Sequence, residues 1–401
     1  MFQLKNEDGK ISLEKYLPLE QLQQIKFPYY LTLKQINLYL LGSSQQFLPN
    51  LKILDIKFST SSLTGPFLDW LSENRTIKEL CVDLPVGYEK TDSLKVFFQK
   101  NNSVQRLKIK KLLVSQLDSL IYLGDNERLQ SIKIELHFSN SEMQMNECQE
   151  RFQAMHSNRS ITKFSFIVQV GSMNSQCISQ LIAKLEKLRK VELQSIEFDK
   201  NSKFISSLIK GSQQHLEDIS LENCKFQLEA LNELLDSFIQ GKFQKMKKLN
   251  LNNISVYKEV NIFIRLFTKK ENYKQWISNP GESNQITERI LLLIQKSKNL
   301  AHLQFGNLEI NSETWLFQFL EAVGQNRNLK YLKLGRQKII INNSQLLSDR
   351  DKLADKVYRA FLENCGNLRY LYMNSPISNM FEFQIVEKLK RNLPRMQELS
   401  L

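Results

Sequence analysis

The side chains best suited to acid–base or nucleophilic catalysis form no recognisable catalytic pattern in this sequence. The four histidines are far apart, at His137, His156, His215 and His302. No HExxH or GxSxG motif is present, and no two glycines are spaced for a dinucleotide-binding loop or a P-loop. Carboxylates are numerous, but spacing places no pair of them in one site. We therefore expect a protein that is not an enzyme and that uses no cofactor and no metal.

The cysteines do not predict a disulfide framework or a zinc site. They are odd in number, widely separated along the chain, and contain no CxxC pair. Four of them are expected to be small core residues, whereas Cys81 is expected to face outward on a strand. Its acidic neighbours Glu79 and Asp83 favour the thiol over the reactive thiolate.

The elements that would position any site come from one recurring pattern. An aliphatic residue is followed by two variable positions, a second aliphatic residue, one variable position and a third. With an occasional Phe or Met, the pattern occurs twelve times at a near-constant spacing, which widens clearly after the copies at Met246 and Leu329. A weaker copy precedes them at Leu33, Ile36 and Leu38. The copies begin at Leu51, Ile77, Val104, Leu129, Ile161, Leu188, Leu216, Met246, Leu300, Leu329, Leu368 and Met396.

Amphipathic segments separate these copies. Apolar residues at three- and four-residue spacing predict helices around residues 67–71, 152–155, 181–185, 204–209 and 228–235. Polar joints such as Asn74-Arg-Thr76 and Asn158-Arg-Ser160 lead into the next strand, and such side chains suit turns because they bond nearby backbone groups. Each repeat is thus strand, loop, helix and turn. One repeat cannot bury its own apolar face, so stacking is required.

The segment from Leu216 to Phe226, LEDISLENCKF, fits the strand motif of the leucine-rich-repeat family, with Cys224 at the position usually held by Asn or Cys. The chain resembles that family over roughly residues 50–401, and its longer, ribonuclease-inhibitor-like branch in particular. The resemblance implies an α/β leucine-rich-repeat solenoid, a horseshoe with a parallel concave sheet and convex helices. Most other copies lack the Asn or Cys, which predicts uneven curvature. Such concave faces usually bind a protein.

Alternation along the strands predicts which side chains face the concave surface. Six cations on neighbouring strands should lie side by side there, and Asp218 and Glu222 should end the group. It suits an acidic protein surface or a phosphorylated segment, whereas nucleic acid is disfavoured because no aromatic residues interleave. The alternative is that these cations only keep an exposed sheet soluble. We call the set the basic field: Arg106, Lys108, Lys110, Lys133, Lys163 and Lys190.

The last strands differ in composition. Alternation places Tyr331, Tyr370 and Tyr372 on the concave side of adjacent strands, with Lys333 beside them. We call the three tyrosines the tyrosine cluster. Tyrosine supplies large contact area at low entropic cost, so the cluster and Lys333 are candidate partner-binding residues. The alternative is that the rings only cover one another.

Domain organisation follows from the spacing. We expect an N-terminal helical cap or degenerate first repeat at residues 1–50, then the solenoid at 51–401, irregular at 252–299 and 335–367. The first irregular segment holds either a degenerate repeat with its strand at 273–278 or an insertion, with a turn at 279–281. Residues 16–27 faintly resemble the opening of an F-box, whose helices precede leucine-rich repeats in ubiquitin-ligase adaptors.

Composition and hydropathy narrow the class of protein and the cellular location that we expect. Of 401 residues, 42% are hydrophobic and 24% charged, which excludes wholesale disorder, and the net charge is +13. The start is polar and the longest aliphatic run, residues 290–294, is far too short to span a bilayer, so we expect no signal peptide and no membrane span. A cytoplasmic location is expected, with the nucleus as the alternative.

Together these features predict a non-enzymatic scaffold that binds a protein partner, plausibly acidic, on its concave face. The alternative is a regulator of catalysis, either a ubiquitin-ligase substrate adaptor or a GTPase-activating regulator of the leucine-rich-repeat type. The activator would need an exposed catalytic arginine, which the sequence does not locate.

Overall fold

The computed structural model describes most of the chain and divides into two units. It describes residues 5–7, 10–13, 30–33, 52–58, 61–85, 88, 91–137, 152–259, 274–276, 280–306, 313–334, 347–373, 391–393 and 395–400. The first unit comprises residues 1–192 and 210–212, and the second comprises residues 193–209 and 213–401. Each unit is described by itself.

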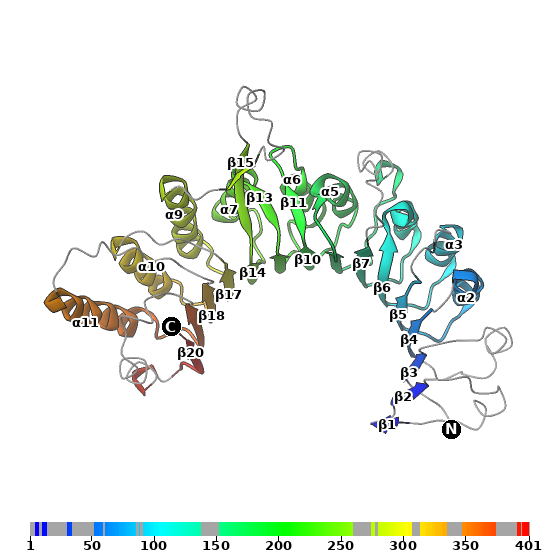
Figure 1. Cartoon of the computed structure of the whole chain (residues 1–401), viewed down its shortest axis with the longest axis horizontal. Coiled ribbons are helices and arrows are strands. Elements are labelled where there is room, and N and C mark those ends of the chain that lie inside the picture. Colours follow the sequence, from blue (N-terminus) through cyan, green and yellow to red (C-terminus); the bar gives the residue numbers. More distant parts are fainter. Residues whose placement is uncertain are drawn as a thin grey trace. The chain divides into compact units, whose positions relative to one another are not determined.

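The first unit alternates strands with helices on one side of a sheet (Figure 1). Its strands follow one another in chain order from β1 to β8, and all pairs from β2 to β8 are parallel. Its elements are β1 Lys5–Glu7, β2 Lys10–Leu13, β3 Tyr30–Leu33, β4 Ile53–Lys57, α2 Ser61–Glu73, β5 Glu79–Asp83, α3 Asp92–Lys100, β6 Arg106–Leu113, the 3-10 helix η3 Val114–Asp125, β7 Ser131–His137, η4 Phe152–Ala154, β8 Lys163–Val168, β9 Met173–Asn174, α5 Ser175–Ala183 and the start of β10 Lys190–Gln194.

The second unit repeats the arrangement in the strand order β12-β14-β17-β18-β19-β20, with every pair parallel. A smaller sheet in the order β16-β15-β13-β11 accompanies it. Its elements are β11 Ile196–Phe198, α6 Phe204–Ser212, β12 Asp218–Glu222, β13 Lys225–Gln227, α7 Leu228–Ile239, β14 Lys248–Leu251, β15 Ser255–Glu259, β16 Lys274–Trp276, α9 Pro280–Lys296, β17 His302–Phe305, α10 Glu313–Gln325, β18 Tyr331–Leu334, α11 Leu347–Asn364, β19 Tyr370–Met373 and β20 Glu398–Ser400.

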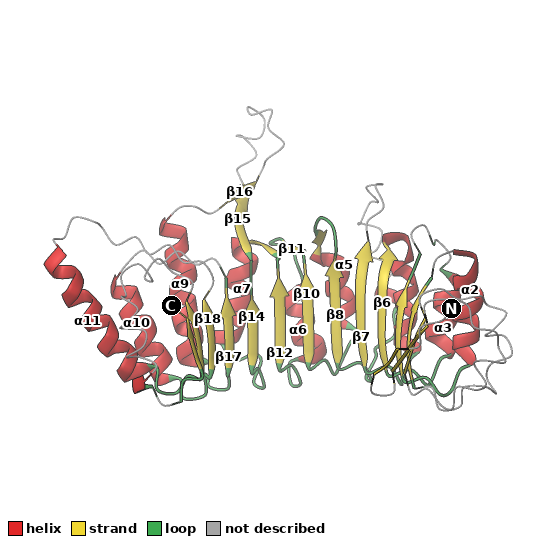
Figure 2. Ribbon diagram, turned by 60° about the horizontal axis from the view of Figure 1, so that its bottom comes forward, coloured by secondary structure: helices red, strands yellow, loops and turns green. Residues whose placement is uncertain are grey.

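In both units the helices cover one face of the main sheet, and Figure 2 shows the strands in front of them. We call the uncovered side the open face. One parallel strand per repeat, backed by a helix, is the architecture of a leucine-rich-repeat solenoid, as the sequence predicted. Among the residues whose burial the structure describes, the middle motif residue is buried, with exposures of 0–3% at Leu80, Leu107, Ile132, Val191, Ile219, Leu249, Leu303 and Leu332. The register of the repeats is therefore confirmed.

Buried asparagines make the turns between helix and strand. Asn158 is 1% exposed, and its Oδ1 accepts hydrogen bonds from the backbone N–H groups of Ser160 and Ile161 at 2.9 and 2.8 Å. Its Nδ2 donates to the carbonyls of Leu123 and Asn126 in the preceding repeat, at 2.8 and 2.7 Å. One side chain thus shapes its own turn and ties it to the neighbouring turn. The same pattern of bonds occurs at Asn101, Asn126 and Asn326.

A second recurring feature is a left-handed residue that follows the motif of a strand. Lys111, Ser195, Asn223 and Asn253 have positive φ angles of 59°, 59°, 53° and 51°. Each stands immediately before an inward-pointing buried residue, as Asn223 stands before Cys224, which is 0% exposed. At Ser195 and Asn223 the left-handed residue lies between a strand of the main sheet and one of the small sheet, whereas Lys111 makes a bulge within β6. Asparagine tolerates that conformation best among these types. The thiol of Cys224 points to the carbonyl of Leu193 at 3.7 Å, so it occupies the position that the family motif reserves for Asn or Cys.

The described residues of segment 252–299 contribute no strand to the main sheet. Strand β14 pairs directly with β17, with Lys248 opposite His302 and Leu249 opposite Leu303. The strand expected at 273–278 is present as β16, but it pairs antiparallel with β15 outside the main sheet. The turn expected at 279–281 is instead the start of α9, where proline is favoured because its missing N–H would have no helical partner.

Two further expectations differ from the structure. The weak first copy lies nearer the N-terminus than expected, because Leu31 and Leu33 of β3 stand opposite Leu54 and Ile56 of β4. The helix expected around residues 152–155 is only the 3-10 turn η4. The F-box-like segment 16–27 and the polar stretch 335–346 lie outside the described residues.

Candidate functional site

The structure places the basic field on the open face of the first unit. Lys108 stands opposite Lys133 across β6 and β7, and Lys163 of β8 stands opposite Ser131. The Lys190 N–H donates to the carbonyl of Thr162 at 3.0 Å, which joins β10 to the same surface. All six cations thus lie on neighbouring strands, as alternation predicted.

Carboxylates neutralise half of this field, which sequence reasoning did not foresee. Three ion pairs join its cations to acids on the same face: Arg106–Glu79 at 3.1 Å, Lys108–Glu135 at 2.7 Å and Lys190–Glu192 at 2.6 Å. A cation outside the predicted set, Lys111, pairs with Asp83 at 2.8 Å. The open face of this unit is therefore a mixed-charge surface, not a uniformly basic one.

The pKa values of Lys110 and Glu192 reflect this mixture of charges. Burial alone would lower the pKa of Lys110, but neighbouring anionic groups, among them Asp55 and Asp83, outweigh it and raise that pKa. Burial alone would raise the pKa of Glu192, but hydrogen bonding and attraction to Lys190 lower it overall. Both groups are therefore charged at neutral pH.

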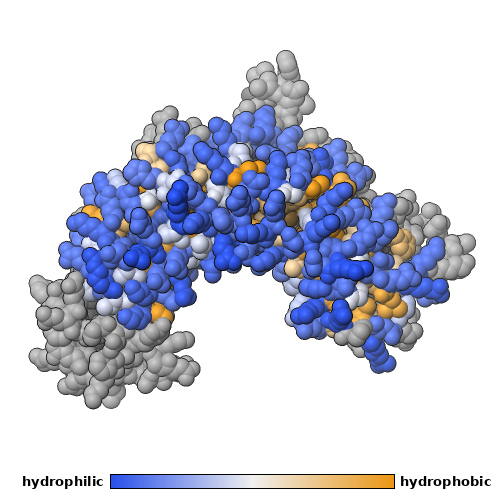
Figure 3. All heavy atoms as spheres, turned by 180° about the vertical axis from the view of Figure 1, so that it is seen from behind, coloured by the Kyte–Doolittle hydropathy of each residue, from blue (hydrophilic) through white to orange (hydrophobic). Residues whose placement is uncertain are grey.

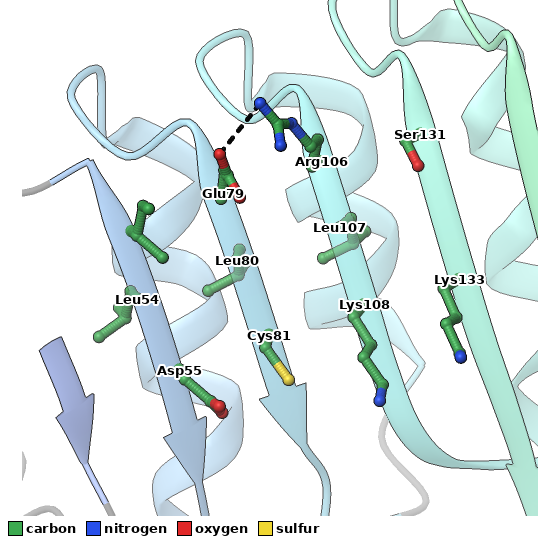
Figure 4. A pocket seen from close by; sticks show the side chains of 11 residues that line it. Leu54, Asp55, Glu79, Leu80, Cys81, Arg106, Leu107, Lys108, Ser131 and Lys133 are labelled. Atoms are coloured by element: carbon green, nitrogen blue, oxygen red, sulfur yellow. Dashed lines mark ion pairs between the residues drawn. The ribbon is translucent and has the colours of Figure 1, made fainter. Parts of the chain in front are cut away.

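A shallow hollow of about 220 Å³ lies on the open face across β4, β5, β6 and β7. Asp55, Cys81, Lys108 and Lys133 stand in one row across it, with the Arg106–Glu79 pair beside the row (Figure 4). Burial, followed by the charge of Asp55, raises the pKa of the Cys81 thiol to about 11. A thiol with this pKa is a poor nucleophile at neutral pH, as the flanking acids predicted.

The tyrosine cluster is contiguous on the open face of the second unit. Tyr331 stands opposite Tyr370 across β18 and β19, and Lys333 stands opposite Tyr372. The ring centroid of Tyr331 lies 5.8 Å from that of Tyr370 and 5.7 Å from that of Tyr372, with interplanar angles of 41° and 42°. All three side chains are partly exposed. The three rings are contiguous, as expected from their adjacent strands, and no described loop buries them.

The cluster has two neighbours that sequence reasoning did not connect with it. His302 stacks on Tyr331, and Glu398 of β20 stands opposite Tyr370. A hydrogen bond to Glu398, with a smaller contribution from burial, raises the pKa of Tyr372 to about 12. Glu398 could have been found from the motif, because it precedes Leu399 as Tyr370 precedes Leu371.

Metal sites and membrane-spanning helices are absent from the described ranges. No group of three or more His, Cys, Asp or Glu side chains there could hold a metal ion. None of the helices described is long and apolar enough to cross a membrane. Val170 and Leu292 are the large apolar side chains exposed in the described part, and Figure 3 shows a mainly hydrophilic surface on the side that it presents.

Comparison with known proteins finds likeness to solved structures. No family model and no curated protein matches the chain. A solved structure of a leucine-rich-repeat protein from Leptospira interrogans aligns over 96% of this chain and 93% of that one, at 15% sequence identity and a TM-score of 0.38. The chain's own strand register, with one parallel strand per repeat and buried motif residues, identifies its fold as a leucine-rich-repeat solenoid.

Proposed function

We propose that this protein is a non-enzymatic scaffold that binds a protein partner on the open face of its leucine-rich-repeat sheet. The tyrosine cluster is the observation that carries the proposal. Open sheet faces are normally covered with small polar or charged side chains, whereas here three aromatic rings lie together and remain partly exposed. An anchor of this kind supplies buried apolar area on binding at low entropic cost.

The surroundings of the cluster support an interface anchor. Tyr372 is hydrogen-bonded to Glu398, and Tyr331 stacks on His302 and meets Tyr370 in a tilted contact. These contacts hold the rings in fixed orientations before a partner arrives, which reduces the entropic cost of binding. Lys333 beside Tyr372 adds a charged rim residue that contributes to orientation more than to affinity.

The basic field adds an electrostatic contribution to the proposed binding. Its cations outnumber the acids paired with them, so it attracts acidic partners at long range and in a salt-dependent way. We further place the chain in the long-repeat, ribonuclease-inhibitor-like branch of the fold. Most repeats are long enough to contain a helix after the strand, which supports that placement.

Affinity purification from the native organism tests the proposal. Tagged wild-type protein and the Tyr370→Ala/Tyr372→Ala variant are compared, and the Tyr370→Phe/Tyr372→Phe variant keeps the rings as a control. We expect the alanine variant to bind the recovered partner about 30-fold more weakly, from a loss of about 2 kcal/mol. The loss should change little between 50 and 300 mM salt, because it is apolar in origin. Wild-type affinity in the alanine variant would refute the cluster as anchor.

The same experiment distinguishes the alternative role. Recovery of a ubiquitin-ligase core subunit would indicate a substrate adaptor, and recovery of a small GTPase would indicate an activating regulator. Either result would replace the plain scaffold with a regulator of catalysis.

A further inference from the structure

The turns that lead from helix to strand in the second unit are strongly basic. They lie at the ends where the strands of the main sheet begin, and Figure 2 shows the loops along that edge. We call them the turn edge: residues 213–217, 240–247, 297–301, 326–330, 365–369, 393 and 395–397. This edge carries one carboxylate, Glu217, and eight cations, all exposed or partly exposed. The cations are Lys242, Lys245, Lys247, Lys298, Arg327, Lys330, Arg369 and Arg395.

The charge excess belongs to this end of the strands. At the other end, the described residues 195–203, 223–227, 252–259 and 306 of the same unit carry four cations and three carboxylates. The first unit has the same bias, with eight cations and two carboxylates in its described helix-to-strand turns: residues 52, 74–78, 101–105, 126–130, 155–162 and 184–189. The excesses of the two units, seven and six, together equal the net charge of +13 of the whole chain.

Backbone hydrogen bonds hold a row of the turn edge in register. The N–H of Lys330 donates to the carbonyl of Ala301, and that of Arg369 donates to the carbonyl of Lys330, both at 2.8 Å. Ala301 is bonded in the same way to Lys247. The row therefore crosses β14, β17, β18 and β19, a length of about 14 Å at the usual strand spacing. Phosphates follow one another every ~3.4 Å along one strand of a DNA duplex, so about four of them fit along the row.

Negative groups near the turn edge reduce the excess without cancelling it. Glu217 pairs with Lys247 at 2.8 Å. Four helices, α7, α9, α10 and α11, end at these turns, and each C-terminus contributes roughly half a negative charge. An excess of about five positive charges therefore remains on this edge.

The turn edge lacks an apolar anchor among its described residues. Val170 and Leu292 are the large apolar side chains exposed in the described part, and neither lies on this edge. Protein–protein interfaces have an apolar core, whereas contacts with nucleic-acid phosphates are electrostatic and need none. The forked guanidinium groups of Arg327, Arg369 and Arg395 suit phosphate oxygens. Backbone binding requires no base stacking, so the shortage of aromatic residues that disfavours nucleic acid on the basic field does not apply here.

We propose that the turn edge of the second unit binds the phosphodiester backbone of a nucleic acid. The proposal goes beyond the scaffold function, because the turn edge is a different surface from the open face that holds the tyrosine cluster. Contacts to phosphates carry no sequence information, so binding should depend little on base sequence.

Fluorescence anisotropy with the full chain tests this proposal. The labelled probes are a DNA duplex of about 20 base pairs, a single-stranded RNA of about 20 nucleotides and a polyglutamate peptide of about 20 residues, measured between about 50 and 300 mM salt, the range over which phosphate contacts weaken steeply. Arg327→Gln/Lys330→Gln/Arg369→Gln removes three cations from the turn edge.

A matched control changes the charge equally at the other end of the strands. Lys200→Gln/Lys203→Gln/Lys225→Gln removes three cations from the same unit, and these side chains are also exposed or partly exposed. Equal denaturation midpoints show that both variants are folded like the wild type, as expected for exposed positions.

We expect a nucleic-acid Kd of about 1–100 µM at 150 mM salt, with polyglutamate at least about fivefold weaker because its charges are spaced further apart. Contact with about four phosphates predicts that log K falls with log salt at a slope of about −3.5 for the duplex. The turn-edge variant should bind about tenfold or more weakly, with a slope flatter by about 2–3, whereas the control should match the wild type. The tighter of the two nucleic-acid probes identifies whether duplex or single strand is the source of the phosphates.

Three results would overturn the proposal. They are no binding of either nucleic acid at 50 mM salt, equally tight binding of polyglutamate, and wild-type affinity in the turn-edge variant or an equal loss in the control. None of these measurements involves the protein partner, so failure here leaves the affinity-purification result independent.

Discussion

The imidazole ring of His302 lies flat against the phenol ring of Tyr331, with ring centroids 3.8 Å apart and planes inclined by 4°. Its Nε2 is buried and has no hydrogen-bond partner in the described part of the chain. Burial, together with the nearby charge of Lys248, lowers the pKa of His302 to about 4. The ring is therefore neutral at physiological pH and behaves as a fourth aromatic member beside the tyrosine cluster.

The lowered pKa predicts a loss of stability in mild acid. In the unfolded chain His302 takes up a proton near its ordinary pKa of 6.5, whereas the folded protein resists protonation until about pH 4. The unfolded state therefore binds more protons in that window, and the free energy of unfolding falls as pH drops from 6.5 towards 4. Urea denaturation at pH 7 and pH 5 measures the effect. His302→Phe keeps a stacked ring and should show a smaller difference between the two pH values. A His302 titration near its ordinary pKa by NMR would contradict the prediction.

The thiol of Cys81 should be slow to alkylate. With its pKa at about 11 instead of 9, the thiolate fraction at pH 8 is about a hundredfold lower than that of an ordinary cysteine. Asp55→Asn removes a charge that raises this pKa and should accelerate the reaction. Peptide mass spectrometry after timed iodoacetamide treatment reads Cys81 separately from the buried Cys177, Cys224 and Cys365. Equal rates in wild type and Asp55→Asn would show that Asp55 has no influence on the thiol.

Asn158→Ala should destabilise the first unit by roughly 2–3 kcal/mol, because a buried polar group left without its partner is costly. The change leaves two backbone N–H groups and two carbonyls without the partners that they have at 2.7–2.9 Å. Asn102→Ala is the control, because Asn102 is exposed and accepts one bond from Arg75 Nη1. Its cost should stay within about 0.5 kcal/mol. Similar denaturation midpoints for the two variants would argue against the turn as a source of stability.

Neighbouring residues of β7 should respond in opposite ways to truncation. Ile132 is 1% exposed, so Ile132→Ala should cost about 2–5 kcal/mol. Lys133→Ala on the open face should change the free energy of unfolding by no more than about 0.5 kcal/mol. A shift of the strand by one residue would reverse this order, so denaturant titrations of the pair test the repeat register directly.

Charge reversal on the open face of the first unit should weaken partner association. Lys108→Glu/Lys133→Glu/Lys163→Glu should abolish capture of an acidic partner, chiefly by slowing association at low salt. Lys108 is already paired with Glu135 and Lys133 attracts Glu192, so reversal of either should also cost stability, whereas reversal of Lys163 should not. Lys133→Glu/Lys163→Glu is best compared with Lys100→Glu/Lys187→Glu, which changes the net charge equally. Equal association rates for the two double variants would show that the field is ordinary solvated surface.

Alternation and period were enough to predict the strands and their faces. Leu107 and Ile109 point inward and Lys108 outward because successive side chains of a strand point to opposite faces, a geometric rule that needs no knowledge of neighbours. The same rule brought Tyr331 next to Tyr370, since the motif fixes the register of adjacent strands. Local physics therefore accounts for the sheet and for the composition of its open face.

The contacts on that face depend on distant residues and could not be read from the spacing. Whether Lys108 pairs with Glu135 or binds a ligand depends on side-chain conformations across two strands. His302, which stacks on Tyr331, is the first residue of β17, the strand that pairs with β14. The wide gap after Met246 hid from sequence reasoning that these two strands are neighbours. Strand β16 also lacks the three aliphatic positions of the motif, so nothing in its sequence marked it as part of a separate antiparallel pair.

The direct pairing of β14 with β17 has a consequence for how this chain can change. Because Lys248 and His302 are in register although a long segment separates them, the sheet does not depend on the length of the connection. Foreign sequence added to the connection between β14 and β17 should therefore leave the alignment of these two strands unchanged. New binding specificity can thus arise by substitution on the open face or by insertion of sequence between β14 and β17.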